Sequence, residues 1–165
     1  MSNLVGDTIG LIHLIASLLA LLFGSLVLAM EKGTVNHVRV GYAYLINMGI
    51  VIVTAFMVYR LFNSFGIFHY AALLSLLIIT LGMIPVLTKK PTGKWKTRHF
   101  SFMYWSVIGL YAAFASEILT RIPETPFLSM LIAATSIICI LGGLFFRRNI
   151  NNWEQVLEGR RKISK

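Results

Sequence analysis

The sequence predicts an all-α integral membrane protein with five transmembrane helices. The 165-residue chain is 57% hydrophobic and only 13% charged, with a mean hydropathy of +0.78, whereas soluble domains are about 25% charged. Apolar runs of about 20 residues recur, which is the length that crosses roughly 30 Å of hydrocarbon. We therefore expect one transmembrane domain over residues 1–146 and a basic cytoplasmic tail over 147–165.

The apolar runs and the residues that bound them predict each helix. We expect helices over about Thr8–Met30, His37–Tyr59, Phe65–Leu87, Arg98–Leu119 and Phe127–Phe146. Short turns make the first four an up-down four-helix core, and the fifth, which lacks histidine and ionisable groups, is expected outside that core. In the tail, Trp153, Val156 and Leu157 recur at helical spacing, which predicts an interfacial amphipathic helix.

Lysine and arginine predict the orientation. Two of them, Arg60 and Arg121, follow the second and fourth helices. The other thirteen lie in or beside the first and third connections and in the tail: Lys32, Arg39, Lys89, Lys90, Lys94, Lys96, Arg98, Arg147, Arg148, Arg160, Arg161, Lys162 and Lys165. This asymmetry predicts a multi-pass protein of the cell membrane with its N-terminus outside and its C-terminus in the cytoplasm. The net charge of +9 is then a topology signal, and we expect no nucleic-acid partner.

The four histidines, His13, His37, His69 and His99, fall one on each of the first four expected helices, near its start. Helix direction places His13 and His69 in an outer layer and His37 and His99 in an inner layer. Alternate helices are diagonal in an up-down bundle, so each layer would hold two imidazoles that face each other.

Two histidines per layer favour haem over a bare metal ion. A zinc ion requires four ligands, whereas haem iron needs only axial ligands from the protein. We therefore predict two b-type haems, with the layers roughly 20–25 Å apart along the helices, which together would carry electrons across the membrane.

Other residues would then surround the cofactors. Gly41 and Tyr44 share a helix face with His37, and Gly10 lies near His13, so the glycines would leave room for a macrocycle. The propionates require cations. The candidates are Arg39, Lys94, Lys96 and Arg98 on the inner side and Arg60 and Arg121 on the outer side.

Other interpretations of the same residues stay open. Histidines near helix ends often satisfy local polar groups, and the protein would then be a non-catalytic membrane protein, such as an assembly factor or small transporter. Small residues beside His13 also allow close helix packing in lipid. His13, His69 and Glu117 together would form a two-histidine, one-carboxylate site for a non-haem metal, or a proton relay.

Two resemblances follow from these motifs. With His37-x-x-x-Gly41-x-x-Tyr44, Phe68-His69 and Arg98-His99, the chain resembles a family of small bacterial predicted membrane proteins of unknown function. Its histidine layout also resembles the cytochrome b561 class of di-haem membrane proteins. That resemblance implies a quinol or ascorbate-like electron donor and an acceptor such as ferric iron. The fifth helix departs from the class, and no ascorbate or quinone site is recognisable. Membrane lipids are the other expected partners, and homo-oligomers stay open.

Overall fold

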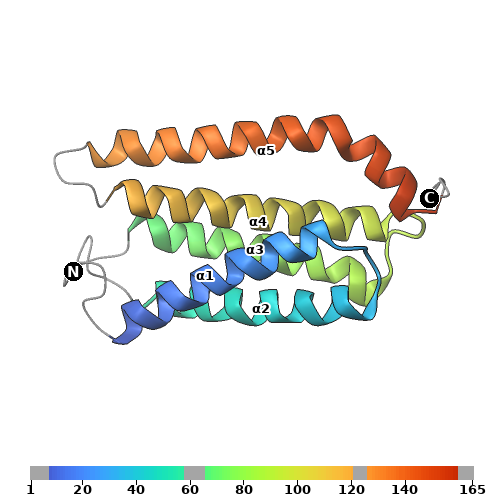
Figure 1. The fold of residues 1–165 in the computed structure, drawn as a ribbon, viewed down its shortest axis with the longest axis horizontal. Coiled ribbons are helices and arrows are strands. Elements are labelled where there is room, and N and C mark those ends of the chain that lie inside the picture. Colours follow the sequence, from blue (N-terminus) through green and yellow to red (C-terminus); the bar gives the residue numbers. More distant parts are fainter. Residues whose placement is uncertain (1–7, 58–65, 121–125, 160–165) are drawn as a thin grey trace. The chain divides into compact units, whose positions relative to one another are not determined.

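A computed structural model describes residues 8–57, 66–120 and 126–159 of the chain. These residues form five helices and no strand (Figure 1). The helices are α1 (Thr8–Ala29), α2 (Val35–Ala55), α3 (Ile67–Thr88), α4 (Trp95–Leu119) and α5 (Phe127–Leu157). Each is long and apolar enough to cross a membrane. The predicted all-α class with five spans is confirmed.

The chain divides into two compact units, Met1–Leu77 and Ile78–Lys165, with the boundary inside α3. The first unit contains α1, α2 and the start of α3, and the second contains the rest of α3 with α4 and α5. A four-helix core of α1 to α4 would draw on both units, and it stays a prediction.

In the first unit, α1 and α2 pack against each other. The buried side of α1 includes Ser17, Ala20 and Gly24 of the stripe of small residues beside His13. On α2, a Cβ added at Gly41 would meet the Val27 side chain at 3.8 Å, which is ordinary van der Waals contact. Small residues on both helices therefore line the region where they pack.

The connection between α1 and α2 is held by two polar side chains. The Lys32 ammonium donates to the carbonyls of Leu28 and Met30, both at 2.7 Å, and so caps the end of α1. Burial lowers the pKa of Lys32 below its ordinary value. The Thr34 hydroxyl accepts from the backbone N–H of His37 at 3.1 Å, which makes Thr34 the N-cap of α2.

In the second unit, α4 and α5 pack closely at a glycine. A Cβ added at Gly142 would lie 2.9 Å from Cγ2 of Ile108, which is too close for any other residue to fit without a shift. The Tyr104 hydroxyl donates to the Gly142 carbonyl at 2.8 Å. Ser116 and Thr135 bring their hydroxyls to 3.0 Å. Polar pairs thus join the two helices along their length.

Helix α5 does not end at Phe146 as predicted but continues to Leu157. Residues 147–152 are polar except for Ile150, and they contain no glycine or proline, so nothing in them stops a helix. The last turns bend toward the start of α4 (Figure 1). There Trp153 meets the rings of Phe100 and Tyr104 at centroid distances of 4.9 and 5.8 Å.

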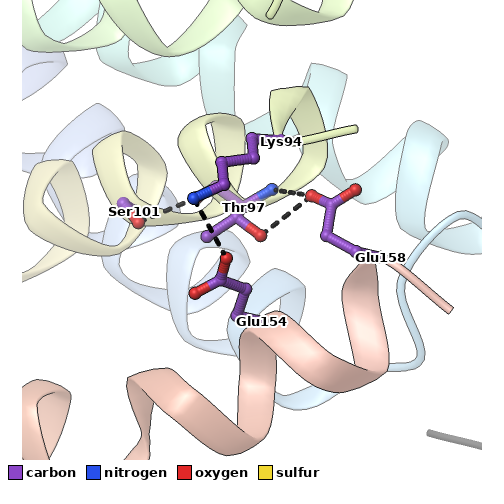
Figure 2. Close-up of polar contacts among 5 residues, drawn as sticks. All are labelled: Lys94, Thr97, Ser101, Glu154 and Glu158. Carbon is purple, nitrogen blue, oxygen red and sulfur yellow. Dashed lines mark hydrogen bonds and ion pairs between the residues drawn. The ribbon is translucent and has the colours of Figure 1, made fainter. Parts of the chain in front are cut away.

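Two carboxylates of α5 and its C-terminal end hold the start of α4 (Figure 2). One oxygen of Glu158 accepts from the Thr97 backbone N–H at 3.0 Å and from the Thr97 hydroxyl at 2.9 Å. Thr97 is the third residue of α4, whose N-cap Lys94 forms no side-chain capping bond. Glu158 therefore supplies a cap from a distant part of the chain. Glu154 pairs with the Lys94 ammonium at 3.7 Å.

Candidate functional site

The four histidines occupy two kinds of position on their helices. His37 and His69 are each the third residue of a helix, α2 and α3 respectively. His13 and His99 lie deeper, as the sixth residue of α1 and the fifth of α4. Third positions are where side chains reach back to cap a helix start, whereas deeper positions turn toward other helices. The ring hydrogen bonds of His13, His69 and His99 follow this division.

His13 is oriented by a hydroxyl of the neighbouring helix. Its Nδ1 lies 2.8 Å from Oγ1 of Thr54 on α2. The Thr54 hydroxyl donates its proton to the backbone carbonyl of Ile50 at 2.6 Å, so Oγ1 accepts from His13. In this arrangement the proton of the neutral ring is on Nδ1, and Nε2 has a lone pair.

His99 reaches the same protonation state through a different partner. Its Nδ1 lies 2.9 Å from the backbone carbonyl of Gly82 on α3, and a carbonyl can only accept. A Cβ added at Gly82 would lie 3.0 Å from Sδ of Met103 and 3.1 Å from Cβ of Phe102. Glycine thus lets α3 approach α4 closely enough for the His99 ring to bond to its backbone. Again Nε2 keeps the lone pair.

His69 has the opposite arrangement. Its Nδ1 accepts from the backbone N–H of Gly66 at 3.0 Å, while the backbone N–H of His69 donates to the Gly66 carbonyl at 3.0 Å. The bond from Gly66 to Nδ1 is one half of a capping box at the start of α3, and Gly66 has no side chain to supply the other half. The residue is 4% exposed, and its ring lies 6.0 Å from that of Phe56. An accepting Nδ1 places the proton of the neutral ring on Nε2, which does not fit ligation through Nε2 in this arrangement.

The outer histidine pair is brought to one end of a helix. His13 bonds to Thr54 and His69 packs against Phe56, and these two residues lie at the C-terminal end of α2. Both histidines therefore lie near the same end of α2, whereas the outer haem layer itself stays a prediction. His37, which is half-buried, belongs to the first unit and His99 to the second, so their pairing stays a prediction.

The remaining predicted site residues differ in burial. Tyr44 is fully buried on α2, and Gly10 and Gly41 are half-buried on α1 and α2. The side chains of Arg39 and Arg98 are exposed, so they do not point into the packed interior of their units. Arg60 and Arg121, the outer cations, lie outside the described residues.

Glu117 is half-buried on α4, in the second unit. Among the described residues, no three His, Cys, Asp or Glu side chains group in a way that could hold a metal ion. A site of His13, His69 and Glu117 would draw on both units, and it stays a prediction.

Sequence reasoning identified the histidines but missed Thr54 and Gly82, which orient two of them. A threonine in an apolar helix predicts a polar contact with another helix, because its hydroxyl needs a hydrogen-bond partner within the membrane. Gly82, three residues before Pro85 in α3, carries a weaker signal, since glycine in apolar helices commonly reflects packing alone.

Comparison with known protein families matches residues 10–148 to the family described as predicted membrane protein, DUF2306. The match covers most of the chain, and the chain belongs to this family. The predicted resemblance to a membrane protein family of unknown function is thereby confirmed, whereas the resemblance to the cytochrome b561 class stays a prediction. No curated protein and no solved structure matches the chain.

Proposed function

We propose that this member of the DUF2306 family is a b-type haem protein that carries electrons across the cell membrane. One observation carries the proposal. His13 and His99, which fall in different predicted layers, both commit Nδ1–H to an oxygen and keep the Nε2 lone pair. Histidines that bind a metal through Nε2 use this same arrangement.

When bound, haem b supplies reversible one-electron transfer at its iron. His13 and His99 would each help to hold one of two haems through Nε2. Thr54 and the carbonyl of Gly82 would fix the orientation of the two rings and raise their basicity as ligands. Both acceptors lie within membrane spans, where a hydrogen bond is not exchanged with water.

His69 and His37 would be the further haem-binding residues that the sequence predicts. His69 would bind through Nε2 after Nδ1 gives up the bond from Gly66 and the ring proton moves from Nε2 to Nδ1, because only that neutral tautomer has its lone pair on Nε2. Capping and ligation are therefore competing states of this side chain.

Surface groups would complete the two sites. Arg39 and Arg98 are exposed beside the inner histidines in sequence and are available to propionates at the membrane surface. The loop charges favour an N-terminus outside and a C-terminus in the cytoplasm. Electrons would pass from a quinol or ascorbate-like donor to an acceptor on the other side.

A second candidate function rests on the capping bond of His69. A histidine that closes a helix start has a structural role. If all four histidines were structural, the protein would be a non-catalytic membrane protein, such as an assembly factor or small transporter.

The test is a visible absorption spectrum of the detergent-purified full-length protein, expressed with added haem and recorded oxidised and dithionite-reduced. We expect the sharp reduced α-band of bis-histidine haem b, with about half of it lost in His13→Ala and about half in His99→Ala, because each binds one of two haems. Thr54→Val should keep haem but weaken its affinity about 10- to 100-fold, as loss of an orienting partner does. A protein that stays colourless after haem reconstitution would overturn the proposal.

A further inference from the structure

A cluster of cations lies at the turn between α3 and α4 in the second unit. Lys89 and Lys90 follow the last residue of α3, and Lys96 and Arg98 lie in the first turn of α4. All four side chains are exposed. Both helices are long and apolar enough to span a membrane, so the turn that joins them lies at a membrane surface. We call these four residues the cation cluster.

The carboxylates at this end of the second unit are already engaged by other groups. Glu154 pairs with Lys94, and Glu158 accepts two hydrogen bonds from Thr97 (Figure 2). In the described residues of this unit, Lys94 is the cation that forms an ion pair with a carboxylate. These two carboxylates therefore do not neutralise the charge of the cation cluster, whose exposed side chains face solvent or headgroups.

Two cations of this cluster lie close to the ring of Trp95. The ammonium of Lys89 lies 4.2 Å from the indole centroid, and that of Lys96 lies 5.9 Å from it. The two ammonium groups are thus no farther apart than the sum of these distances. Cation–π attraction keeps lysines at such positions, and tryptophan favours the interface between hydrocarbon and water.

We propose that the cation cluster, together with Trp95, binds the phosphate-bearing headgroup of an anionic phospholipid. Lysine binds phosphate as a point charge, and two ammonium groups held at one ring can act on one phosphate. The lipid is favoured over a free anion because the turn lies where headgroups lie and because the indole ring can pack beside acyl chains. This inference does not depend on the proposed haem function.

The experiment measures lipid binding to the full-length protein by native mass spectrometry after delipidation in detergent. Phosphatidylglycerol and phosphatidylcholine with identical acyl chains are titrated separately. We expect tighter binding of phosphatidylglycerol, and a loss of about 30-fold in its affinity in the double variant Lys89→Gln, Lys96→Gln, from the typical contribution of two basic residues at an anionic surface. Binding of phosphatidylcholine should not change.

Two matched variants complete the design. The double variant Arg147→Gln, Arg148→Gln removes the same charge from exposed positions on α5 and should keep most of the affinity. The double variant Lys89→Arg, Lys96→Arg keeps the charge and should bind as the wild type does. Equal affinity for the two lipids, an equal loss in the α5 variant, or displacement of the lipid by millimolar inorganic phosphate would each overturn the proposal.

Discussion

Substitution of His69 by glutamine and by alanine separates the two roles that this side chain can play. Glutamine at the third position of a helix can accept from the N-cap backbone N–H, as in a standard capping box. It should therefore keep the bond that Gly66 donates to Nδ1 in the wild type at 3.0 Å. Alanine cannot, so only alanine leaves this N–H without its acceptor.

The expected costs follow from the contacts of the ring. Loss of the capping bond costs about 1 kcal/mol. Both variants also lose the packing of a side chain that is 4% exposed and lies 6.0 Å from the ring of Phe56, and an aromatic pair contributes about 0.5–1.5 kcal/mol. We thus expect the free energy of unfolding to fall by about 1.5–2.5 kcal/mol in His69→Ala and by about 0.5–1.5 kcal/mol in His69→Gln.

The assay is unfolding of the detergent-solubilised protein by sodium dodecyl sulfate, followed by far-ultraviolet circular dichroism, with hydrogen exchange at the Gly66 amide as the local readout. That amide should exchange slowly in the wild type and in His69→Gln and quickly in His69→Ala. Equal destabilisation of the two variants, with the same exchange rate at Gly66, would refute the capping argument.

The same pair of variants tests ligation. If His69 binds haem iron, both variants lose the bis-histidine spectrum of one haem, because neither side chain offers an imidazole. The capping bond also competes with ligation, and its value of about 1 kcal/mol implies an affinity about fivefold weaker than for an uncommitted ring. A full wild-type spectrum in His69→Gln would assign His69 to capping alone.

Three further predictions concern stability. Glu158→Ala should destabilise the protein by about 1–2 kcal/mol, because α4 loses the cap that this residue supplies. Glu154→Gln should cost less than about 1 kcal/mol, because its ion pair with Lys94 is partly exposed. Detergent unfolding of both variants measures the two costs. Gly142→Ala should destabilise by about 1–3 kcal/mol, since its Cβ would overlap a branched side chain of α4, while Gly49→Ala, with nothing within 4 Å, should be neutral or stabilising. Burial lowers the pKa of Lys32 below its ordinary 10.5. Between the folded-state pKa and the unfolded-state pKa the unfolded chain binds more protons, so the free energy of unfolding should rise with pH through that window. Unfolding of Lys32→Gln measured across the same window should show no such rise.

The helices could be predicted from sequence because apolar runs with few charges have one stable form in lipid. Their ends could not be predicted as well. The predicted end of the fifth helix, Phe146, lies eleven residues before the observed end at Leu157. The spacing of Trp153, Val156 and Leu157 does predict a helix in the tail, but not that it continues α5. Polar residues continue a helix when a side chain such as Trp153 finds aromatic partners on another helix. That partner is a tertiary contact, which a local pattern does not contain.

The candidate site shows the same limit. Sequence placed each histidine near a helix start, and the structure agrees. What a ring can do depends on which atom lies next to Nδ1, and this is decided by Thr54 for His13 and by the close approach at Gly82 for His99. Neither partner is near its histidine in sequence. The division of the histidines into a capping ring and rings oriented by another helix therefore depends on contacts between helices, which a local sequence pattern does not contain.

This division bears on the choice between the two candidate functions. If the histidines served only to close helix ends, His13 and His99 would be expected to bond to their own first turns, as His69 does. Instead both rings cross to another helix, and two unrelated acceptors, a hydroxyl and a carbonyl, leave the same nitrogen with a lone pair. A purely structural bond between helices requires one donor and one acceptor and places no demand on the second nitrogen. A metal ligand requires that second nitrogen to be deprotonated, and donation through Nδ1 meets this requirement in both His13 and His99. A structural histidine that donates through Nδ1 has the same protonation state, so the absorption spectrum decides between the two candidate functions.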